Sequence, residues 1–588
     1  MKKALSLLLS LLCVLTIPLC AFGGTDYDAV CPQWCAGELT FTAEGTYERP
    51  FYDVEMDVVF THGTTALTVP AFWDGGSTWK VRFALTECGE WTYETKCSNT
   101  SDIGLHGVKG TVLCTAYDGD LAIYQHGFVK TEPGKKYFVY DDGTPFFYLG
   151  DTHWGMASEE LDSAGPHAGD IQTDSHFCYI VDKRAEQGFT VYQSEPIGAT
   201  YNIQDGIDEN DIAGFRYVDR QFDYIAKAGL LHANAELVFP GYLTESVYGD
   251  KTYFAKLARY WVARYCAYPV LWTLGQETDD TFYEQFTREN NPYKDMCRTI
   301  NACDPYHHPI SAHQEYAARD NVMASNSVFA GVEGHNWFAV QWSPSLTNQY
   351  DFVIPADFWN NKEGKPAILY EGRYENLWTK NFGARAQGWI GFLSGMYGYG
   401  YGCVDLWLYQ SDYDTDTVSN DGIDTITPED KAVPWSTALN FKTAEELGYM
   451  KTFLNDAQWW TLVPDFDSKS AFAANPLHAF FTQLKAIFTG SGSFIDKIVK
   501  FFRFPSVKPF YASAHNENTV VIYFYNPGLA AGTVKGLQQG ADYTVNWFNP
   551  VTGEYEEPET VTAKNGTFRI SQKPTEGDWV LLMQKVSE

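Results

Sequence analysis

Residues 269–280, "PVLWTLGQETDD", change from apolar to acidic within one short stretch. The apolar run 270–274 has the length and residue types of a buried β-strand. A glycine ends this run, and three carboxylates follow within the next five residues. A single acidic cluster is usually a solvated loop, so its meaning depends on whether other strands of the chain end in the same way.

Eight such apolar runs, each ending in polar residues, occur between residues 121 and 455. In chain order they are "FFYLGDTHW", "FTVYQSE", "LHANAELVF", "VLWTLGQE", "HPISAHQE", "SVFAGVEGHNW", "PAILYEGRYE" and "YGYGCVDLW". Patterns between them predict helices over residues 177–187, 252–266, 293–303 and 382–396. Strands that alternate with helices in this way predict an α/β fold, a (β/α)₈ TIM barrel over residues 121–455.

The two ends of the chain have a different pattern of apolar and polar residues. Residues 24–120 and 508–588 alternate apolar and polar residues between Gly, Asn and Asp turns, which predicts an N-terminal Ig-like β-sandwich and a C-terminal β-sandwich. Residues 456–507 form a connecting segment with two amphipathic helical pieces broken by "GSG" at 490–492. We expect this insertion to pack its apolar stripe on the barrel or the next domain, with a membrane or partner surface as the alternative.

The N-terminus, "MKKALSLLLSLLCVLTIPLCAFGG", combines two lysines, an apolar stretch and small residues. This pattern predicts a signal peptide over residues 1–23 and export from a bacterial cell. Cys20 would allow a cell-surface lipoprotein instead, but Pro18 and Leu19 make a poor lipobox. No later segment approaches about 20 uninterrupted apolar residues, so no membrane span is expected. Membrane contact is not the favoured interpretation of the remaining sequence.

Composition narrows the class of protein further. The 588 residues are 45% hydrophobic and 20% charged, which is typical of a globular protein of several domains. A net charge of −32 argues against nucleic acid, because phosphate binding needs clustered Lys and Arg. Twelve cysteines show no zinc-ligand spacing, so no metal or cofactor is predicted. Disulfides after export, Cys297 with Cys303 or Cys31 with Cys35, are plausible.

Two of the strand ends carry glutamates that could act as a pair. The fourth predicted strand ends at Glu277, and the seventh ends at Glu371. TIM-barrel active sites lie at the carboxyl ends of the strands, and strands four and seven face each other across the barrel mouth. Glycoside hydrolysis needs two carboxylates that flank the scissile bond. The pair therefore predicts a catalytic site for an oligo- or polysaccharide.

Other polar and aromatic residues at the predicted strand ends are candidates for substrate binding. A carboxylate at Asp151 could hold sugar hydroxyls, although a structural bond to the backbone is an equal alternative for it. Histidines at two adjacent strand ends suggest hydroxyl donors. The full set of candidates is Asp151, His153, Trp154, Gln193, His313, His335, Asp405 and Trp407.

Residues 121–455 resemble the apiosidase-like catalytic barrel of secreted bacterial glycoside hydrolases. The segments that carry the resemblance are "DDGTPFFYLGDTHW", "KRAEQGFTVYQSE", "YPVLWTLGQE" and "KPAILYEGRYE". The resemblance implies that Glu277 and Glu371 are catalytic, and it associates the family with apiose-containing pectin side chains. Relatives often carry Asp in a "GGD" context where this chain has Gln276-Glu277. By analogy with barrel hydrolases, we expect Glu277 to be the general acid/base and Glu371 the nucleophile, with reversed roles or an inverting mechanism as the alternatives.

The flanking domains resemble the companions of such barrels. "PFYDVEMDVVF" and the strands after it are similar to the N-terminal sandwich of unassigned function that precedes many bacterial glycoside hydrolases. The C-terminal region is similar to a sandwich sometimes labelled collagen-binding, for which sugar binding is an alternative. The rival to an enzyme is a non-catalytic glycan-binding surface protein that keeps the barrel as scaffold. The Glu277/Glu371 pair separates the two, because a lectin needs neither acid chemistry nor a nucleophile.

Overall fold

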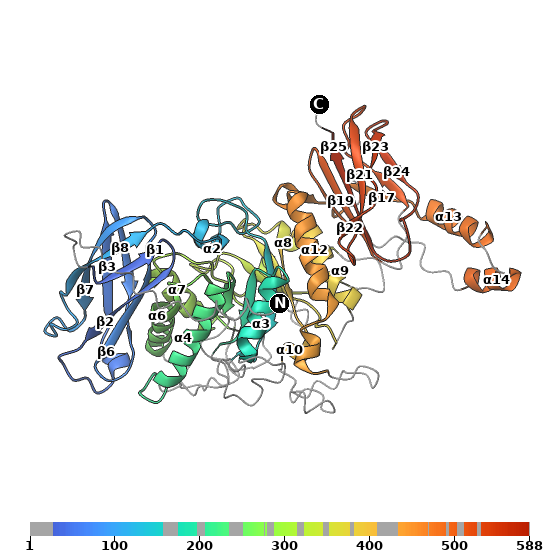
Figure 1. Cartoon of the computed structure of the whole chain (residues 1–588). Helices are drawn as coiled ribbons and strands as arrows, with labels where there is room; N and C mark the ends of the chain where they lie inside the picture. The colour runs from blue at the N-terminus through green and yellow to red at the C-terminus, as the bar shows by residue number, and fades with distance from the viewer. Residues whose placement is uncertain are drawn as a thin grey trace, which may run out of the picture.

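A computed structural model gives the fold of most of the chain. It describes residues 27–156, 175–196, 206–234, 251–275, 277–278, 287, 289–313, 323–344, 352–376, 381–407, 433–467, 470–489, 493–502, 511–525 and 531–586. The predicted signal peptide, and the residues Gln276, Asp279 and Asp280 beside Glu277, lie outside the described residues. In Figure 1 the blue strands of the N-terminal region lie at the left and the red strands of the C-terminal region at the upper right, with the central region between them.

The N-terminal region is a β-sandwich. Its larger sheet has the order β1-β8-β7-β3-β4, and a smaller sheet has the order β2-β6-β5. Alternating burial along β7 places Trp91 in the core, as its sequence pattern requires. The elements are β1 (Ala29–Pro32), β2 (Ala36–Thr42), α1 (Pro50–Asp53), β3 (Met56–His62), β4 (Thr65–Pro70), β5 (Phe72–Trp73), β6 (Thr78–Ala84), β7 (Gly89–Cys97) and β8 (Lys109–Thr115).

The central region contains a parallel sheet of TIM-barrel type. Seven strands of the described residues pair in the order β12-β11-β10-β9-β15-β14-β13. Nearly every residue of these strands is buried, as expected for a parallel sheet covered by helices. The strands are β9 (Tyr148–His153), β10 (Val191–Ser194), β11 (Leu231–Asn234), β12 (Val270–Trp272), β13 (Phe338–Gln341), β14 (Ala367–Glu371) and β15 (Gly398–Tyr401).

The fifth predicted strand is reduced to isolated pairings between the two edge strands, β12 and β13. Ile310 bridges to Trp272 and to His335, and His313 bridges to Ala339. Ser311 N–H donates to the Trp272 carbonyl, and Asn336 N–H donates to the Ile310 carbonyl. The backbone at residues 309–313 therefore contacts both edges of the sheet without forming a strand of its own.

Helices follow the strands along the chain, and four of them match the predicted ranges to within three residues at each end. Among them, the helix at Ile212–Lys227 packs on β11, and the helix at Asn381–Leu393 packs on β14 and β15. The helices are α2 (Ala122–Gln125), α3 (His176–Glu186), α4 (Ile212–Lys227), α6 (Lys251–Tyr265), α7 (Tyr293–Cys303), α8 (Val353–Trp359), α9 (Asn381–Leu393), α10 (Val404–Trp407), α11 (Trp435–Ala438) and α12 (Lys442–Asp456), with 3₁₀ turns at Ala324–Asn326 and Trp459–Thr461.

The sixth predicted strand, "SVFAGVEGHNW", is misplaced. Most of that segment forms turns, and the strand is the following apolar run, β13. His335 therefore lies before β13, and not at the carboxyl end of a strand as predicted. An apolar run of the right length occurs in both segments, so composition alone does not separate them.

The C-terminal region is a second β-sandwich of antiparallel strands. Its larger sheet has the order β16-β18-β19-β25-β21-β22, with β23 paired to β21, and its smaller sheet is β17-β20-β24. Because β16 and β17 belong to these sheets, the sandwich begins at Val463 rather than at residue 508. Its strands are β16 (Val463–Pro464), β17 (Phe472–Ala474), β18 (Tyr511–His515), β19 (Thr519–Phe524), β20 (Gly532–Val534), β21 (Asp542–Asn549), β22 (Glu554–Tyr555), β23 (Glu559–Thr562), β24 (Phe568–Ile570) and β25 (Trp579–Lys585).

Two helices interrupt the C-terminal sandwich between β17 and β18. They are α13 (Pro476–Thr489) and α14 (Phe494–Phe502), which contact each other. In Figure 1 the pair extends away from the sandwich at the right of the view. We call residues 476–502 the helical hairpin.

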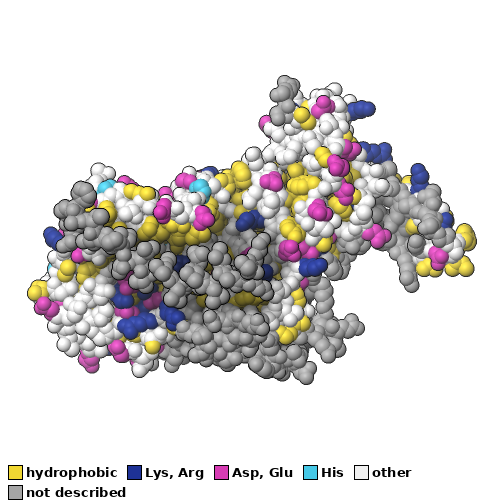
Figure 2. Space-filling model, in the orientation of Figure 1, with side chains coloured by type: hydrophobic (Ala, Val, Ile, Leu, Met, Phe, Trp, Pro, Cys, Tyr) yellow, Lys and Arg dark blue, Asp and Glu magenta, His cyan; other side chains and the backbone are white. Residues whose placement is uncertain are grey.

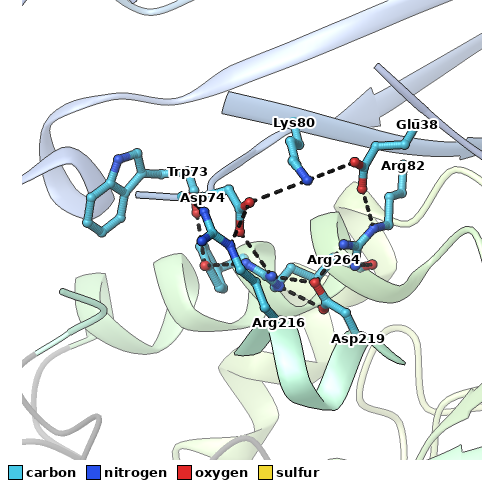
Figure 3. A network of polar contacts seen from close by, with 9 residues as sticks. Glu38, Trp73, Asp74, Lys80, Arg82, Arg216, Asp219 and Arg264 are labelled. Atoms are coloured by element: carbon cyan, nitrogen blue, oxygen red, sulfur yellow. Dashed lines mark hydrogen bonds and ion pairs between the residues drawn. The ribbon is translucent and has the colours of Figure 1, made fainter. Parts of the chain in front are cut away.

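A buried polar network joins the N-terminal sandwich to the barrel. Asp219 of α4 lies 2.6 Å from Arg82 of β6 and 2.5 Å from Arg264 of α6. Arg264 also reaches Asp74, which follows β5, at 3.2 Å. Figure 3 shows these side chains converging between the two domains. Because each charged group has a partner of opposite sign, the interface buries charge without leaving it unpaired.

The cysteines of the described residues are free thiols. They include Cys297 and Cys303, which lie on one helix, and Cys31 and Cys35, which flank a turn. The proposed disulfides are therefore absent from the structure. Burial raises the pKa of Cys35 to about 11, which favours the protonated, less reactive thiol.

Candidate active site

The site begins at the carboxyl end of β14, where the ladder with β13 contains a bulge. Val340 pairs with Leu369, but Gln341 pairs with Glu371, so Tyr370 is an extra residue on β14. Bulges at the rim of a barrel change the direction in which the following side chain points. This one brings both the Tyr370 ring and the Glu371 carboxylate into contact with His313.

The buried Glu371 carboxylate makes one hydrogen bond and one ion-pair contact, at different oxygens. The Tyr374 hydroxyl donates to Oε1 at 2.5 Å, and Nε2 of His313 lies 2.7 Å from Oε2. Trp154 fixes the tyrosine in turn, because its indole N–H donates to the Tyr374 hydroxyl at 2.8 Å. Three side chains from separate parts of the chain therefore hold this carboxylate in one orientation.

His313 connects Glu371 to the segment that contains Glu277. The backbone N–H of Glu277 donates to Nδ1 of His313 at 3.4 Å, a long contact. A neutral imidazole that accepts at Nδ1 carries its proton at Nε2, but the close contact of Nε2 with Glu371 Oε2 lacks hydrogen-bond geometry. Thr278 strengthens the connection, since its N–H donates to the His313 carbonyl at 2.7 Å.

Glu277 lies on a tight turn after β12. Its φ is 53°, and that of Leu274 is 51°, so two non-glycine residues adopt the left-handed conformation within four positions. Such a conformation costs about 1–2 kcal/mol for each residue, and it persists where surrounding contacts impose it. The half-buried Glu277 side chain is thus held by a constrained backbone rather than by a flexible loop.

The charges of both glutamates act on Tyr374. Burial, and then the negative charges of Glu371 and Glu277, raise the pKa of Tyr374 well above its usual value. Tyr374 therefore stays a neutral phenol and remains a donor. A third carboxylate lies close by, because the charge of Glu195, which follows β10, adds to burial and to Glu371 in raising the pKa of Tyr370.

Gln193 lies below the site, inside the sheet. Its carbonyl oxygen accepts from the Tyr148 hydroxyl at 2.8 Å, and its NH₂ donates to Thr152 and to the Tyr370 carbonyl. The side chain is fully buried. The structure therefore places Gln193 as a brace for Tyr370 rather than at the surface that faces a substrate.

Asp151 and His153 turn the other way. Asp151 forms a buried ion pair with Arg184 of α3 at 2.5 Å, and His153 Nε2 lies 2.9 Å from the same carboxylate. Burial would raise the pKa of Asp151, but Arg184 and His153 outweigh it and lower that pKa. The structural alternative considered for Asp151 fits this geometry, and we leave both residues out of the proposed site.

Of the remaining candidates, His335 and Asp405 are held by partners other than Glu371. His335 precedes β13, at the amino end of the sheet, where Lys365 lies 3.0 Å from its Nδ1. The prediction that it follows a strand is wrong. Asp405 is buried in α10 and accepts from Asn376 and from the Val433 amide, and burial raises its pKa. Trp407 ends the same helix, and its side chain is outside the described residues.

Two residues of the site were not singled out from the sequence. Tyr374 follows Glu371 by three positions in "YEGRYE", but spacing alone does not show that its hydroxyl folds back onto the carboxylate. Glu195 ends the run "FTVYQSE" and carried a signal that could have been used, because it is an acid at a barrel strand end.

The fold and the site together are a parallel sheet of TIM-barrel type with carboxylates at the carboxyl ends of its strands. Residues 132–461 match the family described as apiosidase-like, catalytic domain. The chain belongs to this family and is a glycoside hydrolase. Residues 30–98 match a domain of unknown function, DUF5060.

Solved structures agree on the fold. One is a protein from Bacteroides vulgatus ATCC 8482 that has been proposed to be a glycoside hydrolase. It is 16% identical to this chain with a TM-score of 0.62, and the match covers 95% of this chain and 100% of that protein. A glycoside hydrolase family 5 protein from the same organism is 15% identical with a TM-score of 0.56, covering 78% and 94%. A search of curated proteins found no match.

Proposed function

We propose that this glycoside hydrolase is exported and cleaves O-glycosidic bonds of a polysaccharide through Glu277 and Glu371. One observation carries the proposal: the side chains that hold the Glu371 carboxylate, Tyr374 and His313, also interact with Glu277. The backbone N–H of Glu277 donates to His313, and the charge of Glu277 raises the pKa of Tyr374. A scaffold that only binds glycans would have no need to orient a buried carboxylate with a tyrosine hydroxyl and a histidine contact.

The environments of the two glutamates support different roles. Glu371 is buried, accepts a hydrogen bond from Tyr374 and contacts His313, which suits a carboxylate that attacks the anomeric carbon. Glu277 is half-buried on a constrained turn, where it can reach the glycosidic oxygen. In the proposed retaining reaction, protonated Glu277 gives its proton to the leaving oxygen as Glu371 forms the glycosyl bond. Glu277 then deprotonates a water, which displaces Glu371 from the sugar.

We also propose that the parallel sheet closes into a complete (β/α)₈ barrel. Residues 309–313 would take the place of the fifth strand, supported by their backbone hydrogen bonds to Trp272 and Asn336. Closure would bring Glu277 at the end of β12 and Glu371 at the end of β14 to one mouth. The sugar remains a matter of family likeness, and apiose-containing pectin side chains are the first substrates to test.

The test is hydrolysis of a panel of plant and host polysaccharides by wild type, Glu277→Gln and Glu371→Gln. Each substitution removes acid chemistry while it nearly preserves shape. Glu363→Gln is the matched control, because Glu363 precedes β14 and pairs with Lys365 at the opposite end of that strand. We expect both site variants to lose about 100-fold or more in rate, while the control keeps wild-type rates.

The outcome separates the site from the class of activity. If wild type releases sugar and either site variant keeps its rate, the assigned pair is wrong although the enzyme is active. If no protein releases sugar but all bind the same glycans equally, the non-catalytic alternative replaces the proposed function.

A further inference from the structure

The helical hairpin exposes an unusual amount of apolar surface. On α14, Phe494 and Ile495 are 70% and 71% exposed, and Ile498 and Val499 are also exposed. These four positions lie on one face of the helix, because they are spaced one, four and five residues apart. The prediction that this segment buries its apolar stripe on the barrel or the sandwich is therefore wrong for α14.

The first helix of the hairpin continues the same surface. Leu477, Phe481 and Phe488 of α13 are exposed and separated by four and seven residues, so they share a helix face. Figure 2 shows hydrophobic side chains gathered at the outer end of the hairpin. Among the described residues, α13 contacts β20 of the sandwich and its partner α14.

Charge distinguishes the hairpin from the rest of the molecule. The chain carries −32, yet residues 476–502 hold three lysines and one aspartate, a net charge of +2. Arg503 follows directly in the sequence. A basic amphipathic helix with exposed aromatic and aliphatic side chains is the pattern that binds in the interface of an anionic bilayer.

We propose that the helical hairpin docks the protein on an anionic lipid surface, with the apolar faces of α13 and α14 in the headgroup region. The hairpin would lie on the bilayer and not cross it: in the part of the chain that is described, every helix is too short or too polar to span one. The proposal does not depend on the catalytic assignment.

The acidic body of the protein does not prevent such docking. Residues Pro476–Thr489 of α13 form about 21 Å of helix at 1.5 Å per residue. The Debye length at physiological ionic strength is about 8 Å, so charges on the body are largely screened at the far end of the hairpin. The local positive charge then decides the interaction with the lipid headgroups.

A second copy of the chain fits the surface less well. Two hairpins face to face would bring like net charges together. A hairpin against the body of another copy would need a second apolar patch. The other exposed large hydrophobic residues of the described chain come from separate elements and loops: Val30, Ile103, Val353, Val463, Val551, Tyr555 and Val586.

The test is flotation of the full chain with vesicles of phosphatidylcholine alone or mixed with equal parts of phosphatidylglycerol. We expect wild type to bind the mixed vesicles at least about tenfold better, and added salt to weaken that binding. The double variant Ile495→Ser/Val499→Ser should lose about tenfold or more. Lys485→Gln, at an exposed position of α13, should lose about fivefold on the mixed vesicles only.

Ile103→Ser is the matched control, because it removes an exposed apolar side chain, 67% accessible, from the N-terminal sandwich. Its binding should equal that of wild type, and all variants should keep the wild-type thermal midpoint. Equal binding of wild type to both vesicles, or unchanged binding of the double variant, overturns the proposal. So does a vesicle-free dimer in sedimentation velocity that the double variant converts to a monomer, since a second copy would then be the occupant.

Discussion

Tyr374 holds Glu371, the proposed nucleophile, in place. It donates to Glu371, accepts from Trp154 and stays neutral because burial and two carboxylates raise its pKa. Its hydroxyl does not take part in bond cleavage in the proposed reaction. Tyr374 is therefore a positioning residue, whose effect should appear in the chemical step more than in substrate affinity.

Replacing Tyr374 by Phe removes this hydroxyl and keeps the ring. We expect kcat to fall about 10- to 100-fold with KM nearly unchanged, because a hydrogen bond to a charged group is worth about 1.5–3 kcal/mol. Steady-state kinetics on the substrate identified by the polysaccharide panel provide the measurement. Tyr449→Phe is the control, since its hydroxyl donates to Glu445 at the same 2.5 Å on the exposed face of α12. Equal effects of the two substitutions would remove Tyr374 from the site.

The sequence predicted only part of the candidate site, and individual residues show why. Glu371, His313 and Trp154 come together because each lies near the end of a barrel strand, which apolar runs reveal. Side chains along β9 alternate between the two faces of the sheet, so Thr152 faces inward while Asp151 and His153 face the helices. Which residues face inward depends on the register of the strand, which the apolar run does not reveal. The bulge at Tyr370 and the left-handed turn at Glu277 depend on tertiary contacts that no local pattern encodes.

At the scale of elements, β15 supports the site by coming close to its neighbours. A methyl group on Gly400 would lie 1.9 Å from the Tyr370 carbonyl oxygen and 2.4 Å from Gln193 Oε1. Gln193 itself donates to that carbonyl. The strands can therefore hold the Tyr370 bulge only because position 400 has no side chain.

Gly400→Ala should destabilise the protein by about 3 kcal/mol, at the upper end of the cost of overpacking a core. It should also lower activity, because it displaces Tyr370 beside Glu371. Gly63→Ala is the comparison: its φ is 56°, but open space surrounds it, so about 1 kcal/mol is expected. Denaturant unfolding measures both variants, and a Gly400 effect no larger than that of Gly63 would contradict the close packing described here.

Periodicity located most elements well. The predicted helix at 293–303 is α7 residue for residue, because its apolar positions repeat at helical spacing. The short strands were harder: "SVFAGVEGHNW" and the following "FAVQ" both satisfy the composition of a buried strand. The fifth strand position, at residues 309–313, is held by pairings with its neighbours that its own sequence does not reveal.

At the scale of the whole molecule, the interface between the N-terminal sandwich and the barrel responds to acid in a defined direction. Burial would raise the pKa of Asp219, but Arg264 and Arg82 lower it to about 2. An unfolded Asp titrates near 4. Because the pKa of Asp219 is lower in the folded than in the unfolded protein, its ion pairs with Arg264 and Arg82 stabilise the protein fully above about pH 4. This contribution is lost as the pH falls through 2.

Asp219→Asn should lower stability at pH 7 by about 3 kcal/mol or more, because it leaves two buried arginines without their shared partner. The difference from wild type should shrink between pH 4 and pH 2, as the aspartate of wild type becomes protonated. Thermal unfolding across this pH range is the measurement. Glu94→Gln, at an exposed pair with Lys109, should show neither effect, and a pH-independent difference for Asp219→Asn would contradict the assignment.

The same network has a consequence for how such chains can change by recombination. A crossover between sandwich and barrel separates Arg82 and Asp74 from their partners Asp219 and Arg264. Unless the incoming sandwich carries the complementary charges, the hybrid keeps the Arg264–Asp219 pair but loses the contacts of Asp219 with Arg82 and of Arg264 with Asp74. The two domains should therefore be inherited as one unit, although the sequence presents them as separate modules.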